Sequence, residues 1–555
     1  MTDWDHITDF LVVGSGAGMI AALRAHALGK KVLVIEKTDK VGGSTGLSGG
    51  VLWLPNNPFM KRKGMSDSVE DALVYFDTVV GEAGPASSME RRRAYIEGSG
   101  EMLSFLEAEG VEFVHCTDYP DYYAAVRGVK GYKRGRSVEP KAFNVKRLGP
   151  WKDRLRPAIS EPLVLYTHDS PHISRPRTLK GFWIAATTVL RTLFWRLMLT
   201  KTVTCGAALI GRLLEVLLQR NVPVWPESEL ADLVVEDGRV VGAIVRREGH
   251  EVRVRASSGV LLASGGFSHN DAMRKAFSSD QPGRSEWSSA NPGDTGGPIE
   301  IAMDLGAATE FMNEAWWMPA WIQPDGKPSL SVGERCKPGS IMVDAKGDRF
   351  FNEATPYQEA GQLMFAHDRT VGGGVPAWLI IDSRNRSRYT FGWLPPMSTP
   401  EKVIENGTLK RDTTLEGLAR QCDIDPANLV KTVERFNGFA KTGVDEDFHR
   451  GEGLHEQLHG DVTHKPNASL GPVSKPPFYA AQIVPGDLGT NGGLLTDEFA
   501  RVLRKDGTPI QGLYASGNCT ASVMGRKYPG AGGTIGPAAV FGFVAANHAI
   551  NGTRS

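Results

Sequence analysis

The feature that most constrains this chain is a glycine-rich turn near its start. The apolar run from Phe10 to Val13 is suited to a buried parallel strand, and the alanine-rich stretch from Met19 to Leu28 is typical of a helix. Residues 31–36 then predict a second strand. The turn itself consists of Gly14, Ser15, Gly16, Ala17 and Gly18. The order of strand, glycine turn, helix and strand predicts a Rossmann-like α/β unit that binds a dinucleotide.

The residue types in this unit suit a pyrophosphate and a ribose. Glycines let backbone N–H groups approach the phosphates, and the start of the helix adds partial positive charge. Glu36 ends the second predicted strand 22 residues beyond Gly14, where a carboxylate accepts from a ribose hydroxyl. The third glycine of the usual pattern is expected at residue 19, but Met19 stands there and Gly18 lies one place early. We therefore expect the helix to pack on the strand slightly differently.

Length and charge narrow the class of partner. At 555 residues the chain is long enough for two or more domains. Lys plus Arg equal Asp plus Glu at 63 each, so a small uncharged partner is favoured over nucleic acid. The five cysteines form no CxxC pair and the histidines no metal-binding pattern, so we expect a reducing cytoplasm and no bound metal. The first residues do not resemble a signal peptide.

Further glycine-rich segments resemble the flavin-contacting parts of the fumarate reductase flavoprotein superfamily. They are residues 42–50 (GGSTGLSGG), 259–267 (GVLLASGGF) and 512–518 (GLYASGN). The resemblance implies FAD as the cofactor, and the lack of a histidine in the usual attachment context near residues 42–50 indicates noncovalent binding. Besides the turn and Glu36, it implies FAD contacts from Lys37, Gly43, Ser44, Thr45, Ser48, Gly49, Gly50, Ala263, Gly265, Gly266, Gly517, Asn518, Thr534 and Ile535.

This resemblance runs nearly the whole length of the chain and implies a divided domain. The Rossmann-like FAD-binding domain is expected in two parts, residues 1–318 and 489–555, around an inserted α+β catalytic domain of residues 319–488. Within the insert, residues 415–440 have the spacing of amphipathic helices. The substrate pocket is expected between the two domains.

A separate apolar and aromatic segment, residues 181–200, predicts a surface helix. Arg191 and Arg196 disfavour a helix that spans a membrane. The favoured interpretation is a helix packed on its own protein or on a second subunit. The alternative is peripheral membrane contact, with the helix lying where an apolar substrate would partition and both arginines reaching from its aromatic face to water.

Two positions depart from the dicarboxylate-binding pattern of the fumarate reductases. That superfamily holds its substrate with a histidine before a TMGG-like turn and an arginine in an HGANRLGG-like loop. Here Gly489 stands at the first position and Tyr528 at the second. A guanidinium suits a carboxylate, whereas a phenol suits a neutral carbonyl. The ligand is therefore predicted to be uncharged, with an inward-turned Arg526 as a less favoured substitute for the missing clamp.

Four separated segments are similar to the 3-ketosteroid delta-1-dehydrogenases. They are residues 120–123 (PDYY) with 135–144 (GRSVEPKAFN), 349–357 (RFFNEATPY), 476–493 (PPFYAAQIVPGDLGTNGG) and 521–538 (ASVMGRKYPGAGGTIGPA). The resemblance implies that Tyr528 and the backbone N–H of Gly532 bind the C3 ketone. It also implies that Tyr357 removes the C2 proton as general base. Tyr122 is the implied helper of the base, with Tyr123 as the adjacent alternative.

The implied base is chemically demanding. A phenol is a weak base at neutral pH, so we expect the pairing of tyrosines and the edge of the flavin to lower its pKa. Electrons would pass from the steroid to FAD and then to an external, quinone-like acceptor. The predicted function is the introduction of a C1–C2 double bond into a 3-ketosteroid.

Other functions stay open. One is a delta-4-(5-alpha) 3-ketosteroid dehydrogenase, and another is a reductase of a small unsaturated acid, which the missing histidine and arginine disfavour. A third class is a non-enzymatic or RNA-associated protein in which FAD is structural. Zero net charge and the candidate acid–base groups disfavour that class.

Overall fold

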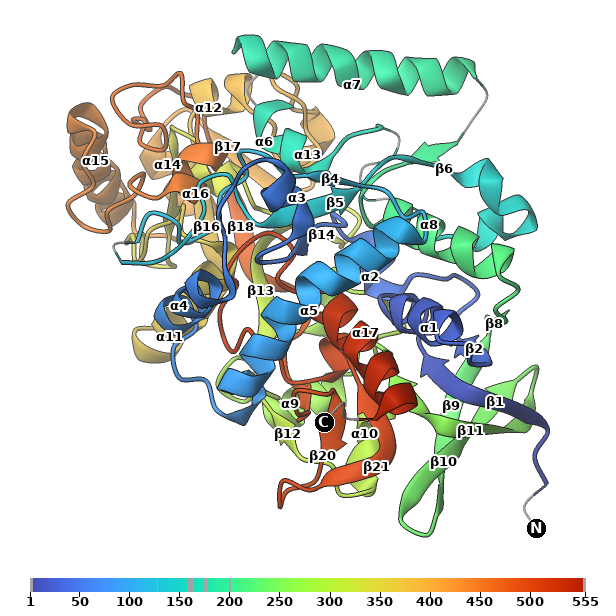
Figure 1. The fold of residues 1–555 in the computed structure, drawn as a ribbon. Coiled ribbons are helices and arrows are strands. Elements are labelled where there is room, and N and C mark those ends of the chain that lie inside the picture. The colour runs from blue at the N-terminus through green and yellow to red at the C-terminus, as the bar shows by residue number, and fades with distance from the viewer. Residues whose placement is uncertain are drawn as a thin grey trace.

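The computed structural model contains two large sheets with helices packed around them (Figure 1). It describes residues 3–126, 128–157, 159, 161, 163–173, 178–198 and 201–552. Residues 199 and 200 of the predicted surface helix, and residues 1, 2 and 553–555 of the predicted FAD-binding domain, lie outside the described residues.

The larger sheet contains the glycine turn. Its strand order is β20-β21-β10-β11-β1-β2-β8, and β9 pairs with β10. The strands β8, β2, β1, β11 and β21 run parallel to their neighbours in that order, with Val12 of β1 between Val34 and Leu261. The bounds are β1 His6–Val13, β2 Val32–Ile35, β8 Val224–Trp225, β9 Ser228–Glu236, β10 Arg239–Arg247, β11 His250–Leu262, β20 Arg501–Leu503 and β21 Pro509–Ala515.

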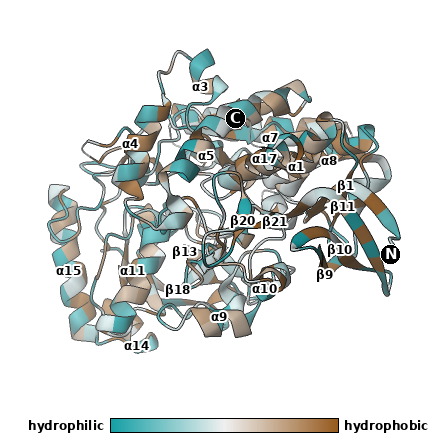
Figure 2. Ribbon diagram, turned by 60° about the horizontal axis from the view of Figure 1, so that its bottom comes forward, coloured by the Kyte–Doolittle hydropathy of each residue, from teal (hydrophilic) through white to brown (hydrophobic). Residues whose placement is uncertain are grey.

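Both faces of this sheet are covered, which explains why its central strand is apolar at consecutive positions. Phe10 and Val12 pack into the core below α1 (Gly18–Ala27), α5 (Met89–Ala108), α8 (Cys205–Gln219) and α17 (Ile535–Asn551). Leu11 and Val13 point to the opposite core, because successive side chains of a strand alternate. Figure 2 shows much of β1 and β11 in brown, the colour of hydrophobic residues.

The predicted strand, turn, helix and strand are confirmed, and Gly18 explains the displaced glycine. A Cβ atom on Gly18 would lie 2.8 Å from Cβ of Ala263 and 2.9 Å from Cγ1 of Val12. Gly18 therefore provides the close contact between helix and sheet, which leaves Met19 free to be a buried apolar residue of α1.

The second sheet has the order β14-β13-β18-β16-β15, with β17 on β18. One face packs against α11 (Tyr357–Thr370), and the other packs against α14 (Leu415–Gln421) and α15 (Pro426–Thr442). The amphipathic helices predicted at 415–440 are thus confirmed. The strand bounds are β13 Ala315–Ile322, β14 Pro328–Leu330, β15 Ser340–Val343, β16 Ala377–Ile381, β17 Leu409–Asp412 and β18 Phe478–Thr490.

The proposed domain boundaries fall inside two of these strands. Position 318/319 lies in β13 and position 488/489 in β18, and the two strands pair antiparallel from Ala315 with Thr490 to Trp321 with Ile483. The division into residues 1–318, 319–488 and 489–555 stays a proposal.

Short elements complete the fold. The helices are α2 Gly43–Leu47, α3 Pro58–Arg62, α4 Val69–Val79, α6 Ser170–Ile173, α9 Asp271–Phe277, α10 Gly297–Asp304, α12 Ser383–Arg388, α13 Glu401–Glu405 and α16 Leu454–His459. The strands are β3 Leu52–Trp53, β4 Phe113–His115, β5 Ser137–Pro140, β6 Phe143–Asn144, β7 Thr202–Val203, β12 Thr309–Glu310 and β19 Gly493–Leu494.

The predicted surface helix is confirmed as α7 (Leu179–Leu197), which lies along the outside of the molecule (Figure 1). Its buried residues are Gly181, Thr188 and Thr192, which are small or polar. The large apolar residues are on the outer side: Leu179, Phe182, Trp183, Val189, Leu190, Leu193, Phe194 and Leu197 are exposed. The apolar face is therefore not packed on its own protein.

Arg191 differs from the membrane-surface expectation as well. Its Nε and Nη2 donate to the carbonyl of Val164 at 2.9 and 2.6 Å, and its guanidinium lies 4.7 Å from the ring centre of Tyr166. This arginine ties α7 to the protein instead of reaching outward. Within the described residues, every helix is too short or too polar to cross a membrane.

Candidate active site

The structure brings three predicted catalytic tyrosines together from distant parts of the chain. The ring centres of Tyr357 and Tyr528 lie 4.9 Å apart, those of Tyr122 and Tyr357 5.5 Å, and those of Tyr122 and Tyr528 5.9 Å. All three side chains are buried. The hydroxyl of Tyr122 lies 3.4 Å from that of Tyr357. Tyr122, and not the adjacent Tyr123, is therefore the residue that meets the predicted base.

A backbone carbonyl holds two of the segments that carry these tyrosines. The N–H of Tyr122 donates to the carbonyl of Pro529 at 3.0 Å, and the hydroxyl of Tyr75 donates to the same oxygen at 2.6 Å. The neighbouring Asp121 accepts from Nε1 of Trp53 at 2.9 Å and from Nη1 of Arg136 at 2.8 Å. The loop that contains Tyr122 is thus fixed to the loop that contains Tyr528.

A buried ionic network positions Tyr357, the first residue of α11. Glu353 accepts from Nε and Nη2 of Arg349 at 2.7 and 2.8 Å and from Nη1 of Arg450 at 3.2 Å. Burial opposes its ionisation, but the two guanidinium groups hold the pKa of Glu353 below its usual range. Nη1 of Arg335 donates to the carbonyl of Thr355 at 2.7 Å. Removing one member of such a network would leave an uncompensated buried charge.

Gly532 lies in the loop that also holds Tyr528, and its conformation requires glycine. Its φ angle is +96°, and a Cβ atom would lie 2.5 Å from the backbone N of Trp53 and from the carbonyl of Val51. The hydroxyl of Tyr528 lies 2.9 Å from Oγ1 of Thr534. Tyr528 and Gly532 are therefore brought together by one tight turn before α17.

The acidity of the tyrosines differs from the expectation. Burial raises the pKa of Tyr357 well above its ordinary value, and the neighbouring phenols raise it further. Burial also raises the pKa of Tyr122. The expectation that pairing of tyrosines lowers the pKa of the base is wrong for the protein's own side chains, because burial disfavours the charged phenolate and the neighbouring phenols add to this effect.

The predicted dinucleotide turn and flavin loop contact each other. Oγ of Ser15 donates to Glu36 at 2.5 Å and accepts from the N–H of Gly42 at 2.9 Å. A Cβ atom on Gly16 would lie 3.1 Å from Oγ1 of Thr45. Glu36 also accepts from Oγ1 of Thr38 at 2.9 Å. The predicted ribose acceptor therefore lies beside the start of the flavin loop.

Several of the other predicted flavin contacts pack closely against neighbouring segments. Gly14 approaches the carbonyl of Ala263, and Gly49 and Gly50 lie against Thr167 and Cys205. Lys37 points elsewhere, since its Nζ pairs with Glu229 at 3.0 Å and contacts Oγ1 of Thr295 at 2.9 Å. Further contacts in the region join Asn518 to Trp316 at 3.0 Å, and Trp316 lies edge-on to Tyr528 at 5.3 Å.

Asp294 is a buried residue of this region that the sequence reasoning missed. Oγ of Ser44 donates to it at 2.7 Å, and a Cβ atom on Gly265 would lie 2.6 Å from its Oδ1. Burial raises the pKa of Asp294 to about 7, although its hydrogen bonds with Ser44 and Asn291 oppose this. The signal that could have found it is the glycine-rich run GDTGG at 293–297.

These residues fit an FAD molecule. The helices α1 and α17 both begin without a side-chain cap, which leaves N–H groups at their starts for a phosphate or a flavin oxygen. Among the described residues, the buried Oδ1 of Asn291 and Oγ of Ser516 have no hydrogen-bond partner. A pocket is lined by Trp316, Gly517, Asn518 and Thr534, among others. Backbone N–H groups and side-chain oxygens that could hydrogen-bond to FAD thus lie in the region where the sequence predicts FAD contacts.

Arg526, the less favoured substitute clamp, is directed away from the tyrosines. Its Nη1 pairs with Glu314 at 2.5 Å, and its Nη2 donates to Asn313 at 3.2 Å. The side chain is partly exposed. Its guanidinium is therefore already paired with a carboxylate of the protein.

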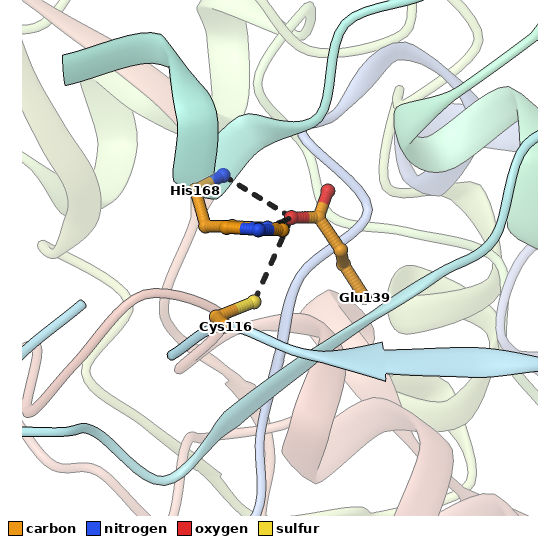
Figure 3. A group of neighbouring side chains, drawn as sticks. All are labelled: Cys116, Glu139 and His168. Atoms are coloured by element: carbon orange, nitrogen blue, oxygen red, sulfur yellow. Dashed lines mark hydrogen bonds and ion pairs between the residues drawn. The ribbon is translucent and has the colours of Figure 1, made fainter. Parts of the chain in front are cut away.

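Cys116, Glu139 and His168 form a compact cluster beside the flavin loop (Figure 3). The carboxylate of Glu139 accepts from the N–H groups of Thr167 and His168 at 2.9 and 3.1 Å and from the His168 ring. Burial opposes protonation of the ring, but Glu139 raises the pKa of His168 overall. Burial and Glu139 also raise the pKa of the Cys116 thiol. We interpret this group as a structural tie, because protein donors already occupy both carboxylate oxygens.

Comparison with known proteins agrees with this geometry. The family described as FAD binding domain matches residues 9–535. A 3-oxosteroid 1-dehydrogenase of Mycolicibacterium smegmatis is 42% identical over 97% of this chain and 96% of its own. A 4-oxocyclohexanecarboxylate 2-dehydrogenase of Sinomonas cyclohexanicum is 35% identical over 97% and 92%.

A solved structure is similar over the whole fold. The crystal structure of 3-ketosteroid delta1-dehydrogenase from Sterolibacterium denitrificans, in complex with 1,4-androstadiene-3,17-dione, has a TM-score of 0.93 and 39% identity to this chain. The similarity extends over 99% of this chain and 100% of the chain in the crystal structure. The predicted α/β class, FAD cofactor and similarity to 3-ketosteroid delta-1-dehydrogenases are confirmed. The chain belongs to the FAD binding domain family, with the 3-oxosteroid 1-dehydrogenases among its relatives.

Proposed function

We propose that this protein is an FAD-dependent 3-oxosteroid 1-dehydrogenase, which introduces a double bond between C1 and C2 of a 3-ketosteroid. The observation that carries the proposal is the contact between the hydroxyls of Tyr122 and Tyr357 at 3.4 Å, beside the ring of Tyr528. The 42% identity to a 3-oxosteroid 1-dehydrogenase over nearly the whole chain supports it.

Each residue of the cluster has a distinct role in this proposal. The hydroxyl of Tyr528 and the N–H of Gly532 donate to the C3 carbonyl oxygen and stabilise the negative charge that grows there. This charge acidifies the hydrogens on C2, and Tyr357 removes one of them as general base. The hydroxyl of Tyr122 lies 3.4 Å from the Tyr357 oxygen and so orients the base toward the substrate. Noncovalently bound FAD supplies the acceptor of the C1 hydride.

Anaerobic mixing with androst-4-ene-3,17-dione tests the function. We expect loss of the oxidised-flavin absorbance and a 1,4-diene product identified by mass and NMR. Succinate, the reduced partner of fumarate, is the control for a dicarboxylate enzyme, and 4-oxocyclohexanecarboxylate is the control for the other relative. A second assay with 5α-androstane-3,17-dione, which is saturated at both C1–C2 and C4–C5, separates the alternatives: a new double bond at C4–C5 would establish the delta-4-(5-alpha) alternative and overturn the C1–C2 assignment. Absence of bleaching with several 3-ketosteroids would also overturn it.

The outer face of α7 supports a second part of the proposal, namely contact with a membrane surface. A helix that buries Gly181, Thr188 and Thr192 and exposes its leucines and aromatic residues has its apolar side turned away from the protein. Both a steroid and a quinone-like electron acceptor partition into lipid. A cytoplasmic enzyme held at the membrane would meet both there.

Binding to lipid vesicles tests this contact. The double variant Leu190→Glu with Phe194→Glu places two charges on the outer face, and we expect it to stay in solution when the wild type sediments with vesicles. Met397→Glu is the matched control, because Met397 is also exposed but is not part of α7. A wild type that forms dimers and does not sediment would favour the second subunit instead of the membrane.

A further inference from the structure

A series of proton-carrying groups extends from the proposed base toward α16. The hydroxyl of Tyr357 lies 3.4 Å from that of Tyr122. Tyr119 lies close enough to Tyr122 for each phenol to affect the pKa of the other. The hydroxyl of Tyr119 lies 3.3 Å from Nε2 of His459. The three phenols and the imidazole therefore follow one another from the base toward α16.

The backbone around Tyr119 holds this line in place. The N–H of Tyr119 donates to the carbonyl of Cys116 at 3.2 Å. A Cβ atom on Gly135 would lie 1.8 Å from the carbonyl oxygen of Tyr119, so the two segments pack with no room for a side chain. His459 is the last residue of α16, and its own carbonyl accepts from Nζ of Lys337 at 2.7 Å. Both ends of the line are thus anchored.

The proposed reaction needs such a line because its base is buried. Each turnover leaves one proton on Tyr357, whose side chain is only 4% exposed. That proton must leave before the next substrate can react. Phenol and imidazole groups both donate and accept, so each can pass a proton to its neighbour. Among these groups, imidazole has the ordinary pKa nearest to neutral, which suits it to exchange the proton with water.

We propose that Tyr119 and His459 form the exit path for the C2 proton, from Tyr357 through Tyr122 and Tyr119 to Nε2 of His459. The path rests on the proposed function. The C2–H bond breaks, its electron pair forms the C1–C2 double bond as the hydride leaves C1 for FAD, and its proton goes to the Tyr357 oxygen. Each hydroxyl then passes on its own proton and receives the next one.

The far side of the His459 ring is the place where the proton leaves the path. A Cβ atom on Gly333 would lie 4.0 Å from Nδ1 of His459, and Gly333 is itself partly exposed. A proton taken up at Nε2 leaves the path on this side, next to the partly exposed Gly333, and the ring returns to the neutral state. Tyr119 and His459 therefore act after the bond-breaking step and do not touch the steroid.

Exchange of the substrate's C2 hydrogen with solvent measures this path apart from hydride transfer. The holoenzyme is reduced chemically under anaerobic conditions, so that FAD cannot accept a hydride. It is then incubated with androst-4-ene-3,17-dione in D2O, and deuterium at C2 is followed by mass spectrometry. We expect Tyr119→Phe and His459→Ala to exchange at least about tenfold more slowly than the wild type. Tyr123→Phe is the matched control and should stay within about twofold.

Chemical rescue separates proton transfer from packing. Added imidazole should restore exchange in His459→Ala, whereas pyrazole, which has the same shape but is a much weaker base, should not. Equal rescue by both compounds would overturn the proton path, and so would wild-type exchange rates in both variants. A wild type that neither bleaches nor exchanges would overturn the proposed function instead. FAD content and melting temperature of Tyr119→Phe confirm that the variant is folded.

Discussion

The FAD-binding turn and the tyrosine cluster differ in how the chain brings their residues together. The turn consists of consecutive residues between β1 and α1, so its geometry follows from the local order of strand, glycines and helix. In the cluster, Tyr122 and Tyr357 are separated by 235 residues and depend on contacts from other segments. A local motif can thus be identified in the sequence alone, whereas the cluster requires the whole fold. Substitutions in the turn should therefore lower the FAD content, whereas substitutions in the cluster should slow the reaction and leave the FAD content unchanged.

The largest expected effect comes from a substitution that disrupts the glycine turn. Gly14 has a φ angle of +110°, and a Cβ atom would lie 2.3 Å from the carbonyl oxygen of Ala263. We expect Gly14→Ala to displace β1 from β11 and to lose FAD, and with it all dehydrogenase activity. The flavin absorbance per protein after purification measures this.

Gly438→Ala is the matched control for that substitution. Gly438 lies inside α15, and apart from its chain neighbours and the backbone of its own helix no described atom lies within 4 Å of a Cβ placed there. Alanine favours a helix over glycine, so this variant should keep FAD and be slightly more stable. A Gly14→Ala protein with full FAD content would show that the close approach to Ala263 is not required.

The next largest effect comes from a substitution in the tyrosine cluster that leaves the glycine turn unchanged. Tyr357→Phe removes only the hydroxyl of the proposed base, so we expect kcat to fall by about 10²–10⁴-fold while FAD content stays at the wild-type level. Steady-state dehydrogenation of androst-4-ene-3,17-dione measures the loss. Tyr123→Phe should keep its activity, because its hydroxyl does not join Tyr122 and Tyr357. A loss smaller than about tenfold for Tyr357→Phe would assign the base to another group.

Much of the turn was predictable from the sequence, and the exceptions have physical reasons. The sequence pattern predicted strand, helix and acidic strand end correctly, but it could not tell that Gly18 takes over the close contact with Ala263 and Val12. It also missed Asp294, which reaches Ser44 from a segment 250 residues away. A lone aspartate between glycines has no periodicity that would reveal such a contact.

The cluster was predicted from resemblance, and its environment was not. Matching motifs named Tyr122, Tyr357 and Tyr528, but only the fold shows Pro529 holding the Tyr122 segment and Tyr119 reaching His459. The apolar stretch at 181–200 predicted a helix correctly. Which side faces the protein depends on which residues the neighbouring segments contact, so hydropathy alone could not indicate that side.

A smaller expected effect is the pH dependence of kcat/KM, which tests the tyrosine cluster and not the turn. Burial raises the pKa of Tyr357 well above its ordinary value of 10.0, so at neutral pH only a small fraction carries the charge that a base needs. That fraction grows with pH, and we expect kcat/KM to rise by about tenfold per pH unit on the alkaline side of neutrality. The residual activity of Tyr357→Phe should lack this rise. A wild-type profile that is flat between neutral and alkaline pH would contradict the role of a tyrosine base.

The smallest expected effect lies at His168, which joins the two regions. Glu139 holds the Thr167 and His168 backbone, and Oγ1 of Thr167 donates to the carbonyl of Gly49 in the flavin loop at 2.7 Å. Ser137 lies on β5, the strand that also contains Glu139, and its Oγ donates to the carbonyl of Ala531, next to Gly532, at 2.7 Å. The tie between His168 and Glu139 thus supports the flavin loop and the tyrosine loop together.

The charge of His168 gives this tie a distinct pH dependence. Although burial opposes it, Glu139 raises the pKa of His168 above the unfolded value of 6.5, so the folded protein holds this proton more tightly than the unfolded chain. Its stabilisation is complete below that value and is lost as pH rises through the folded pKa. His168→Gln keeps a hydrogen-bond donor but carries no charge. The difference in melting temperature between wild type and variant should therefore be largest near about pH 6 and shrink toward about pH 9. A difference that is constant or grows with pH would mean that His168 contributes by packing and not by its charge.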